Sequence, residues 1–309
     1  MHQTAPRLPA ELPIEVSEVS LRRNAWYSPV SFELASRLIQ RMPRNASRSL
    51  AVGLGQLGYT FCHSRREVLL QNLEPLIPDP AQRDVVCRKC FRAFLRMLHD
   101  FCDSAAGGQT RINALLTERR GFESLAAARA QGRGTLLVTG HLGAWELGGM
   151  ILAGDGFPLN VVTLEEPTEQ LNRWRQEFRH RFGIKTITVG SDKFAFVEII
   201  QALKRNELVA MLVDRPYLRS GVPVRLFGRQ TLFSAAAARL WQHTGAAVIP
   251  AFVLQLAPGK YGCYAYPPVE MRPEHSLQEN TQVLADVFQA IIRESPEQWF
   301  NFVPIWQCL

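Results

Sequence analysis

The pattern of apolar and polar residues changes near residue 130. From residue 135 onward, short apolar runs alternate with amphipathic runs of helical spacing. The strand-like runs are TLLVTG, LNVVTL, KTITVG, ELVAMLVD, AAVIPAFVLQ and YGCYAYPPVEM. The helix-like runs are AWELGGMILAG, QLNRWRQEFRHRFG, DKFAFVEIIQALKRN, FSAAAARLWQHTG and a last helix over about 279–294, with a polar loop following ELVAMLVD. This alternation predicts an α/β fold with a mostly parallel sheet covered by helices on both faces.

The region before this sheet is helical in pattern. Apolar residues recur at helical spacing from Ser31 to Phe61, and the later run DPAQRDVVCRKCFRAFLRMLHDFCD places apolar residues on one side and arginines on the other. Prolines punctuate the first 25 residues and indicate an extended arm. We therefore expect an arm over 1–30 and one domain over 31–309, consisting of a basic helical part at 31–105 and an α/β core at 130–309.

Composition narrows the class of protein. At 309 residues with 47% hydrophobic content, the chain can bury a sizeable core. No window reaches the roughly 18 consecutive apolar residues that a membrane-spanning helix needs. The N-terminus lacks the charged-then-apolar layout of a signal peptide, and the six cysteines follow no regular framework. These features favour a reduced, cytoplasmic protein.

The net charge of +7 suggests an anionic partner. A membrane surface, a phosphorylated lipid, an acidic protein and a nucleic acid all fit this charge. Between Leu34 and Arg66 the chain has six arginines and no acidic residue. Combined with the helical apolar spacing, this favours a basic surface that lies on anionic lipid. The alternative is an ordinary solvated charged face.

Several motifs suggest chemistry that their context does not support. GLGQLG at 53–58 spells a dinucleotide fingerprint but follows a basic helical stretch rather than a buried strand, so close helix packing explains it better. Cys87, Cys90, His99 and Cys102 fall within one predicted helix and cannot close around a zinc ion. Neither a G-x-S-x-G elbow nor a phosphate-binding P-loop occurs, so we expect no metal, no cofactor and a nucleophile supplied by a substrate.

TLLVTGHLGAWELGGM at 135–150 has the parts of a catalytic site. His141 follows a predicted buried strand and lies where α/β sheets present reactive groups. Glu146 comes five residues later, at the start of the next helix. A histidine that acts as general base needs one free ring nitrogen, while a carboxylate on the other fixes the tautomer. The alternative is a loop histidine near an unrelated glutamate.

Several sequence blocks along the chain, HLGAWE among them, occur in an order that resembles the late acyltransferases of lipid A biosynthesis. These enzymes belong to a wider group of bacterial acyltransferases that has a His-x4-Asp/Glu motif. The resemblance covers roughly residues 34–306. The blocks that carry it are RREVLLQNLEPLIPD, HLGAWE, RQEFRHRFG, ELVAMLVDRPYLRSGVPVRLFGRQTLFSAAAARLWQHTGAAVIPAF and PEQWF. It implies a glycerol-3-phosphate-acyltransferase-like fold and direct attack of a lipid hydroxyl on an acyl thioester, without an acyl-enzyme.

By this resemblance, His141 deprotonates the attacking hydroxyl and Glu146 orients His141. Arg179 matches the family's inner arginine best, with Arg175 and Arg181 as competitors. Asp214 lies at another strand end, in a block expected to form the facing wall of the site.

Further candidates for substrate binding lie in and after that facing wall. Arg215, Arg219, Arg225 and Arg229 are candidates for binding acceptor phosphates, because a guanidinium offers a planar fork that is always charged. Ser234 stands where the family has a threonine. The alternative is that most of these arginines are solvated surface residues.

The resemblance also implies partners. The donor is an acyl carrier protein or acyl-CoA, and the acceptor is a lipid A precursor or a related glycolipid. Because the helical region is too polar to span a bilayer, we expect a peripheral enzyme on the cytoplasmic face of the bacterial inner membrane, with no nucleic-acid partner. The alternatives are acylation of a different lipid or natural-product hydroxyl, a thioesterase, and a lipid-binding relative without catalysis.

Overall fold

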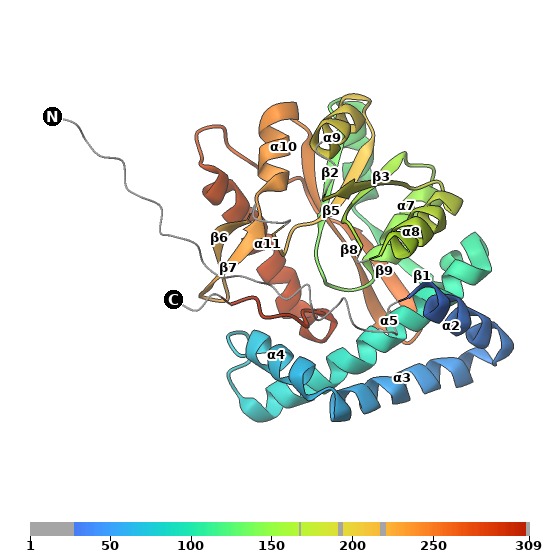
Figure 1. Cartoon of the computed structure of the whole chain (residues 1–309). Coiled ribbons are helices and arrows are strands. Elements are labelled where there is room, and N and C mark those ends of the chain that lie inside the picture. Colours follow the sequence, from blue (N-terminus) through green and yellow to red (C-terminus); the bar gives the residue numbers. More distant parts are fainter. Residues whose placement is uncertain (1–27, 167, 191–193, 217–220, 307–309) are drawn as a thin grey trace.

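The structure is a computed structural model that describes residues 28–166, 168–190, 194–216 and 221–306 (Figure 1). Most of the arm expected over 1–30 lies outside these ranges. The described part has a central sheet with helices on both faces and a helical region at the N-terminal end (Figure 1). The predicted α/β architecture is therefore confirmed.

The central sheet has seven strands in the order β1-β9-β8-β2-β5-β3-β4. Five of them, from β8 to β4 in this order, run parallel, while β9 is antiparallel to β8 and parallel to β1. Their bounds are β1 (Leu116–Arg120), β2 (Thr135–Thr139), β3 (Leu159–Leu164), β4 (Lys185–Val189), β5 (Leu208–Leu212), β8 (Ala247–Ala257) and β9 (Lys260–Ala265). The central strand β2 is buried on both faces, which explains its unbroken apolar sequence.

Alternate residues of β2 enter two separate hydrophobic cores. Leu136 and Val138 pack in one core, and Leu137 packs in the other. The first core includes α9 (Ala195–Lys204), α10 (Ala236–Thr244) and α11 (Leu277–Glu294). The second includes α6 (Phe122–Ala130), α7 (Trp145–Gly154) and α8 (Glu169–Arg181). Together the two cores fix the sheet between its helical layers.

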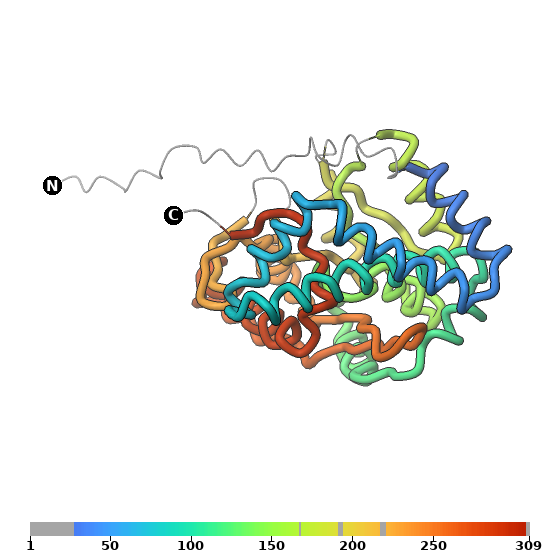
Figure 2. The backbone as a smooth tube through the Cα atoms, turned by 90° about the horizontal axis from the view of Figure 1, so that it is seen from below, coloured from blue at the N-terminus to red at the C-terminus, as the bar shows by residue number. Residues whose placement is uncertain are grey.

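The N-terminal helices lie together across one end of the sheet, below it in Figure 1 and in front of it in Figure 2. They are α2 (Pro29–Arg41), α3 (Arg44–Phe61), α4 (His63–Leu73) and α5 (Pro80–Leu115). Within the described ranges, no helix combines the length and the hydropathy needed to cross a bilayer.

Helices α3 and α5 pack closely through a small residue. A Cβ atom on Gly55 would lie 2.7 Å from the carbonyl oxygen of Phe91, so the helices could not approach this closely with a larger residue. The interpretation of GLGQLG as a packing motif is therefore confirmed. Cys87 and Cys90 are fully buried in the first core, as expected of structural cysteines.

The interpretation of the segment after β5 as a polar loop is wrong for residues 221–232. These residues belong to an antiparallel hairpin of β6 (Gly221–Leu226) and β7 (Arg229–Ser234). Its two turn residues, Phe227 and Gly228, both have positive φ angles of 50° and 79°, which the tight turns of two-residue hairpins require. Because phenylalanine rarely adopts such a φ angle, the sequence signal for this turn was weak.

Candidate active site

His141 and Asp214 meet because their strands are neighbours. Strands β2 and β5 pair in parallel with Thr139 opposite Leu212, and each functional residue follows its strand by two positions. The Nδ1 atom of His141 lies 2.8 Å from Oδ1 of Asp214. The backbone N–H of His141 also donates to Oδ2 of the same carboxylate, at 2.9 Å. One aspartate therefore holds both the ring and the backbone of the histidine.

Two glycines permit this close approach. A Cβ atom on Gly140 would lie 3.0 Å from Cγ of Asp214, so the carboxylate has room only beside a glycine. Gly143 has a φ angle of 66°, and a Cβ atom there would lie 2.1 Å from the carbonyl oxygen of Val253. The sequence GHLG is thus required by the backbone path of the loop as well as by the histidine.

The imidazole is poised as a neutral base. Burial and the positive charge of Arg215 lower the pKa of His141, although the Asp214 carboxylate opposes them. Burial alone would raise the pKa of Asp214, but the neighbouring His141 and Arg215 lower it below its usual value, so this carboxylate is ionised. In the described part of the chain Nε2 of His141 has no hydrogen-bond partner, and the side chain is partly exposed. This nitrogen is therefore open to a substrate hydroxyl.

The C-terminal segment closes one side of the site. The backbone N–H of Phe300 donates to the carbonyl oxygen of His141 at 2.7 Å, and the N–H of Gly143 donates to the carbonyl oxygen of Gln298 at 3.0 Å. Residues near the end of the chain thus pair with the histidine loop and fix its position.

Two buried amides anchor this segment and were not among the residues predicted from the sequence. The side chain of Asn301 contacts Asp214 at 3.5 Å and accepts a hydrogen bond from Nε of Arg215 at 2.6 Å. From α4, Asn72 donates to the carbonyl oxygens of Asn301 and Val303 at 2.7 and 2.8 Å. The only sequence signal was an asparagine within each of two apolar segments, QNLEPL and WFNFV.

Glu146 does not orient His141 in this structure. It lies in the first turn of α7 and pairs with two arginines of α8, with 2.7 Å to Nη2 of Arg179 and 3.2 Å to Nη1 of Arg175. The ring that contacts His141 from this helix is Trp145, edge to face at 5.6 Å. The orienting hydrogen bond expected from Glu146 is instead made by Asp214, because the register of β2 and β5 brings Asp214 to the imidazole.

The two arginines hold Glu146 ionised. Burial alone would raise its pKa, but the charges of Arg179 and Arg175 outweigh burial and lower the pKa below its usual value. Arg179 is buried, and its Nη1 atom has no hydrogen-bond partner. The competing Arg181 stacks over the ring of Phe178. Of the three arginines proposed for this position, Arg179 and Arg175 reach Glu146.

The remaining predicted residues lie in different surroundings. Ser234 is fully buried, accepts a hydrogen bond from the N–H of Ala236 and donates its own N–H to Val213, next to Asp214. Arg225 is exposed on the β6–β7 hairpin. Arg229, on the same hairpin, pairs with Glu74 at 2.6 Å. Arg219 lies outside the described residues. Among these positions Arg215 alone has a described contact with the His141–Asp214 pair, through Asn301.

The described ranges contain no group of three or more His, Cys, Asp or Glu side chains arranged to hold a metal ion. The site contains an ionised carboxylate, a neutral imidazole with one free nitrogen and a nearby buried arginine–glutamate cluster. This set can remove a proton from a hydroxyl and return it to a leaving group.

Comparison with known proteins identifies the class of enzyme. A family described as bacterial lipid A biosynthesis acyltransferase matches residues 30–308. The chain is 27% identical over 275 residues to the phosphatidylinositol mannoside acyltransferase of Mycolicibacterium smegmatis, covering 87% of this chain and 88% of that protein. It is also 27% identical over 268 residues to the lipid A biosynthesis lauroyltransferase of Escherichia coli, covering 85% of each. This protein therefore belongs to the bacterial lipid A biosynthesis acyltransferase family and is an acyltransferase that acts on a lipid.

Proposed function

We propose that this protein is a membrane-peripheral O-acyltransferase that moves a fatty acyl chain from acyl carrier protein or acyl-CoA to a hydroxyl of a lipid A precursor or related glycolipid. The observation that carries the proposal is the His141–Asp214 pair, in which Asp214 holds Nδ1 and leaves Nε2 of His141 free. A neutral imidazole held in this tautomer is suited to take a proton from an alcohol.

The reaction needs no covalent enzyme intermediate. Nε2 of His141 accepts the hydroxyl proton as the acceptor oxygen attacks the thioester carbonyl carbon. The carbon–sulfur bond then breaks, and the imidazolium returns the proton to the departing thiolate. Asp214 stabilises the imidazolium while it exists, because its ionised carboxylate lies on Nδ1. Proton transfer of this kind contributes on the order of 10² to 10⁴ in rate.

In this proposal Glu146 and Arg179 do not act as the general base. They form one side of the site, next to His141. Their ion pair ties the start of α7, which carries Trp145 against His141, to α8. This arrangement supports a positioning role for both side chains.

The acceptor is proposed from the names of the relatives. One similar protein is named for phosphatidylinositol mannoside and another for lipid A, and both of these acceptors are glycolipids. The chain is equally identical to both relatives, so we propose a glycolipid hydroxyl without choosing between them. The alternatives are acylation of another lipid or natural-product hydroxyl, thioester hydrolysis, and lipid binding without turnover.

The N-terminal helices support contact with a membrane surface, which we propose is the cytoplasmic face of the inner membrane. An exposed row on α3 consists of Leu50, Leu54, Leu57 and Phe61, each more than two-fifths exposed. Spacings of three and four residues place these side chains on one side of the helix. A second exposed row, Val30, Leu34 and Leu38, follows α2. Apolar rows on helices rich in arginine are typical of proteins that lie on anionic lipid.

The proposed function is tested by supplying radiolabelled acyl carrier protein or acyl-CoA with and without a lipid A precursor or a phosphatidylinositol mannoside. Acyl-lipid that forms with the native protein and is absent with His141→Ala supports the proposal. Free fatty acid formed at the same rate without acceptor would assign a thioesterase instead. If neither product formed with any donor, the protein would be a binding relative.

A further inference from the structure

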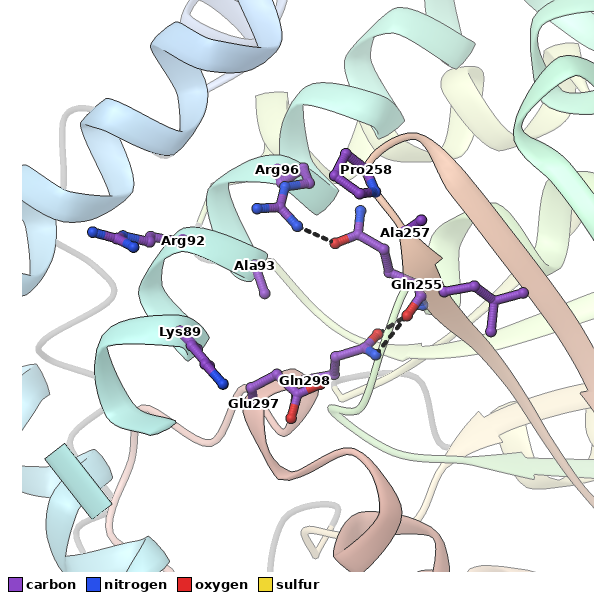
Figure 3. Close-up of a pocket in the computed structure, with 10 residues that line it drawn as sticks. Lys89, Arg92, Ala93, Arg96, Gln255, Ala257, Pro258, Glu297 and Gln298 are labelled. Atoms are coloured by element: carbon purple, nitrogen blue, oxygen red, sulfur yellow. Dashed lines mark hydrogen bonds between the residues drawn. The ribbon is translucent and has the colours of Figure 1, made fainter. Parts of the chain in front are cut away.

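A basic pocket lies outside the His141 site, between α5, the end of β8 and the 3-10 helix η1 (Pro296–Gln298) (Figure 3). Its volume is about 280 Å³. Lys89, Arg92 and Arg96 line one side, at spacings of three and four residues that place them on one face of α5. Gln255 and Gln298 line the other side (Figure 3). We call this the basic pocket.

The three cations have no acidic partner within the described residues. Arg92 donates to the neutral amide oxygen of Gln56 at 3.0 and 2.6 Å, and Nη1 of Arg96 donates to the amide oxygen of Gln255 at 2.7 Å. Nε of Arg96 is buried without any hydrogen-bond partner. Elsewhere on these helices, by contrast, arginines do pair with acids, as Arg48 does with Asp100 at 3.0 Å.

Glu297 also lines the basic pocket, but it forms no ion pair with these cations among the described residues. The pocket therefore keeps an excess of positive charge around a cavity. Positive charges that lie close together repel one another unless an anion joins them, and a guanidinium fork matches the oxygens of a phosphate. This arrangement indicates a binding site for a phosphate group.

The wall of the basic pocket is bonded directly to the catalytic loop. The side chain of Gln298 clamps Gln255, accepting from its N–H at 2.8 Å and donating to its carbonyl oxygen at 3.0 Å. The backbone carbonyl oxygen of Gln298 accepts the N–H of Gly143, two residues after His141. A ligand in the pocket therefore contacts a residue that holds the loop of the proposed base.

The basic pocket faces away from the exposed apolar row of α3. Gly55, which contacts α5 at Phe91 and Arg92, lies about 130° around α3 from the middle of the row of Leu50, Leu54, Leu57 and Phe61, at 100° per residue. If the row rests on lipid, the pocket stays on a side that water reaches. This position suits a phosphate that arrives on a soluble molecule rather than one embedded in the bilayer.

We propose that the basic pocket binds the phosphate of the acyl donor, the group that coenzyme A and the prosthetic arm of acyl carrier protein have in common. This inference rests on the proposed function, because it names the part of the donor that the protein holds at a distance from the thioester. Arg96 supplies the guanidinium contact. Arg92 points away from Gln255 and Gln298 (Figure 3), and it adds charge at the rim together with the exposed Lys89.

The test compares two donors that differ in phosphate. In the double variant Arg92→Gln/Arg96→Gln, KM for acyl-4′-phosphopantetheine, and likewise for acyl-CoA, is expected to rise about tenfold or more, since hydrogen bonds to charged groups are lost. A rise for acyl-CoA alone would assign the pocket to the nucleotide phosphates and would overturn the inference. KM for acyl-pantetheine, which has no phosphate, stays the same, and so does KM for the lipid acceptor. Lys89→Gln changes an exposed residue that has no side-chain partner in the described part of the chain, so it gives a smaller rise without disturbing packing. Lys204→Gln, an exposed lysine on α9, is the matched control for loss of charge and leaves both values unchanged.

Calorimetry with unacylated coenzyme A separates this inference from the reaction, because it needs no turnover. Binding by the native protein and by His141→Ala, with weaker binding by the double variant, supports the basic pocket even if no acyl transfer is found. Equal binding by all three proteins overturns it. A rise in KM for the acceptor alone would assign the pocket to a lipid phosphate and overturn the donor assignment. An equal rise for acyl-CoA and acyl-pantetheine would mean a general structural effect and would overturn it as well.

Discussion

The carboxylate of Asp214 accepts two hydrogen bonds from His141, one from the ring Nδ1 at 2.8 Å and one from the backbone N–H at 2.9 Å. The two residues are 73 positions apart, and the parallel register of β2 with β5 alone brings them together. Because both oxygens of the carboxylate are used, the orientation of the imidazole and the position of its loop depend on the same side chain.

Asp214→Asn is therefore expected to reduce kcat about 100-fold or more, within the range of general-base catalysis. The amide oxygen can still accept the backbone N–H of His141, which turns the amide NH₂ toward Nδ1. That donor forces the proton onto Nε2, the nitrogen that must act as base. Steady-state acyl transfer measures the loss. A variant with near-native kcat would mean that Asp214 has no part in proton transfer.

His141→Ala is expected to abolish transfer while leaving the fold intact. The imidazole is partly exposed and fills little of either core, so its removal costs little packing. Circular dichroism and thermal melting check the fold, and the radiolabel assay checks turnover. Persisting native-like turnover in this variant would remove His141 from the mechanism.

Glu146→Gln tests whether Glu146 has a different role from Asp214. The substitution leaves the buried Arg179 without its charged partner, and loss of one member of a buried ion pair costs about 3 kcal/mol of unfolding free energy. Chemical denaturation measures this loss. Since Glu146 makes no contact with the imidazole, the pH dependence of the remaining activity should match that of the native protein.

A shift of the acidic limb of that pH profile in Glu146→Gln would show instead that Glu146 acts on His141. Glu169→Gln is the matched control, because its partner Arg173 is exposed and the pair is an i,i+4 contact on the surface of α8. Exposed pairs of this kind contribute little, so the control should denature as the native protein does.

The sequence predicted the architecture because its signals are local. Unbroken apolar strands such as TLLVT and helices with apolar periodicity each follow from a few consecutive residues. The hairpin at 221–234 was missed because its turn depends on a positive φ at Phe227, a conformation that the residue type does not suggest. The order of the strands was not predicted, since pairing between distant segments leaves no local pattern.

The site was predicted in part for the same reason. His141 follows a recognisable strand, and Glu146 lies at the start of a recognisable helix. Their spacing therefore suggested that Glu146 orients His141. Their actual partners come from elsewhere, Asp214 from β5 and Arg179 from α8. Asn301 was missed because a buried asparagine differs from a surface one only in the folded chain.

The acidic limb of kcat/KM is expected to have an apparent pKa below 6.5, the ordinary value for histidine, because burial and Arg215 favour the neutral imidazole. Activity is then flat through neutral pH and falls only as His141 becomes protonated. The folded pKa of His141 and that of Asp214 are both lowered, so the unfolded chain binds protons first as the pH falls. The stability that these groups contribute is therefore present above their unfolded pKa values and is lost at lower pH.

Equilibrium unfolding measured from pH 8 to below pH 3 checks this sign, because the contribution of Asp214 is lost only below its unfolded pKa. In Asp214→Asn the carboxylate that raises the pKa of His141 is gone, so the acidic limb of the residual activity should move further toward low pH. A limb that moved to higher pH would contradict the electrostatic account of the pair.

Membrane contact through α3 predicts that Leu54→Glu/Leu57→Glu binds anionic vesicles at least about tenfold more weakly, because two buried leucine side chains are worth about 3 kcal/mol or more in lipid. Sedimentation with vesicles of phosphatidylglycerol and phosphatidylcholine measures the binding. The arginines of these helices add a contribution that salt screens, so binding of the native protein should also fall as ionic strength rises. Val197→Glu is the control, since this exposed residue lies on α9, far from α3 (Figure 1). If vesicle binding weakened equally in both variants, the row on α3 would not be the membrane-binding surface. If it weakened only in the α3 variant, this row would be the face that contacts the membrane.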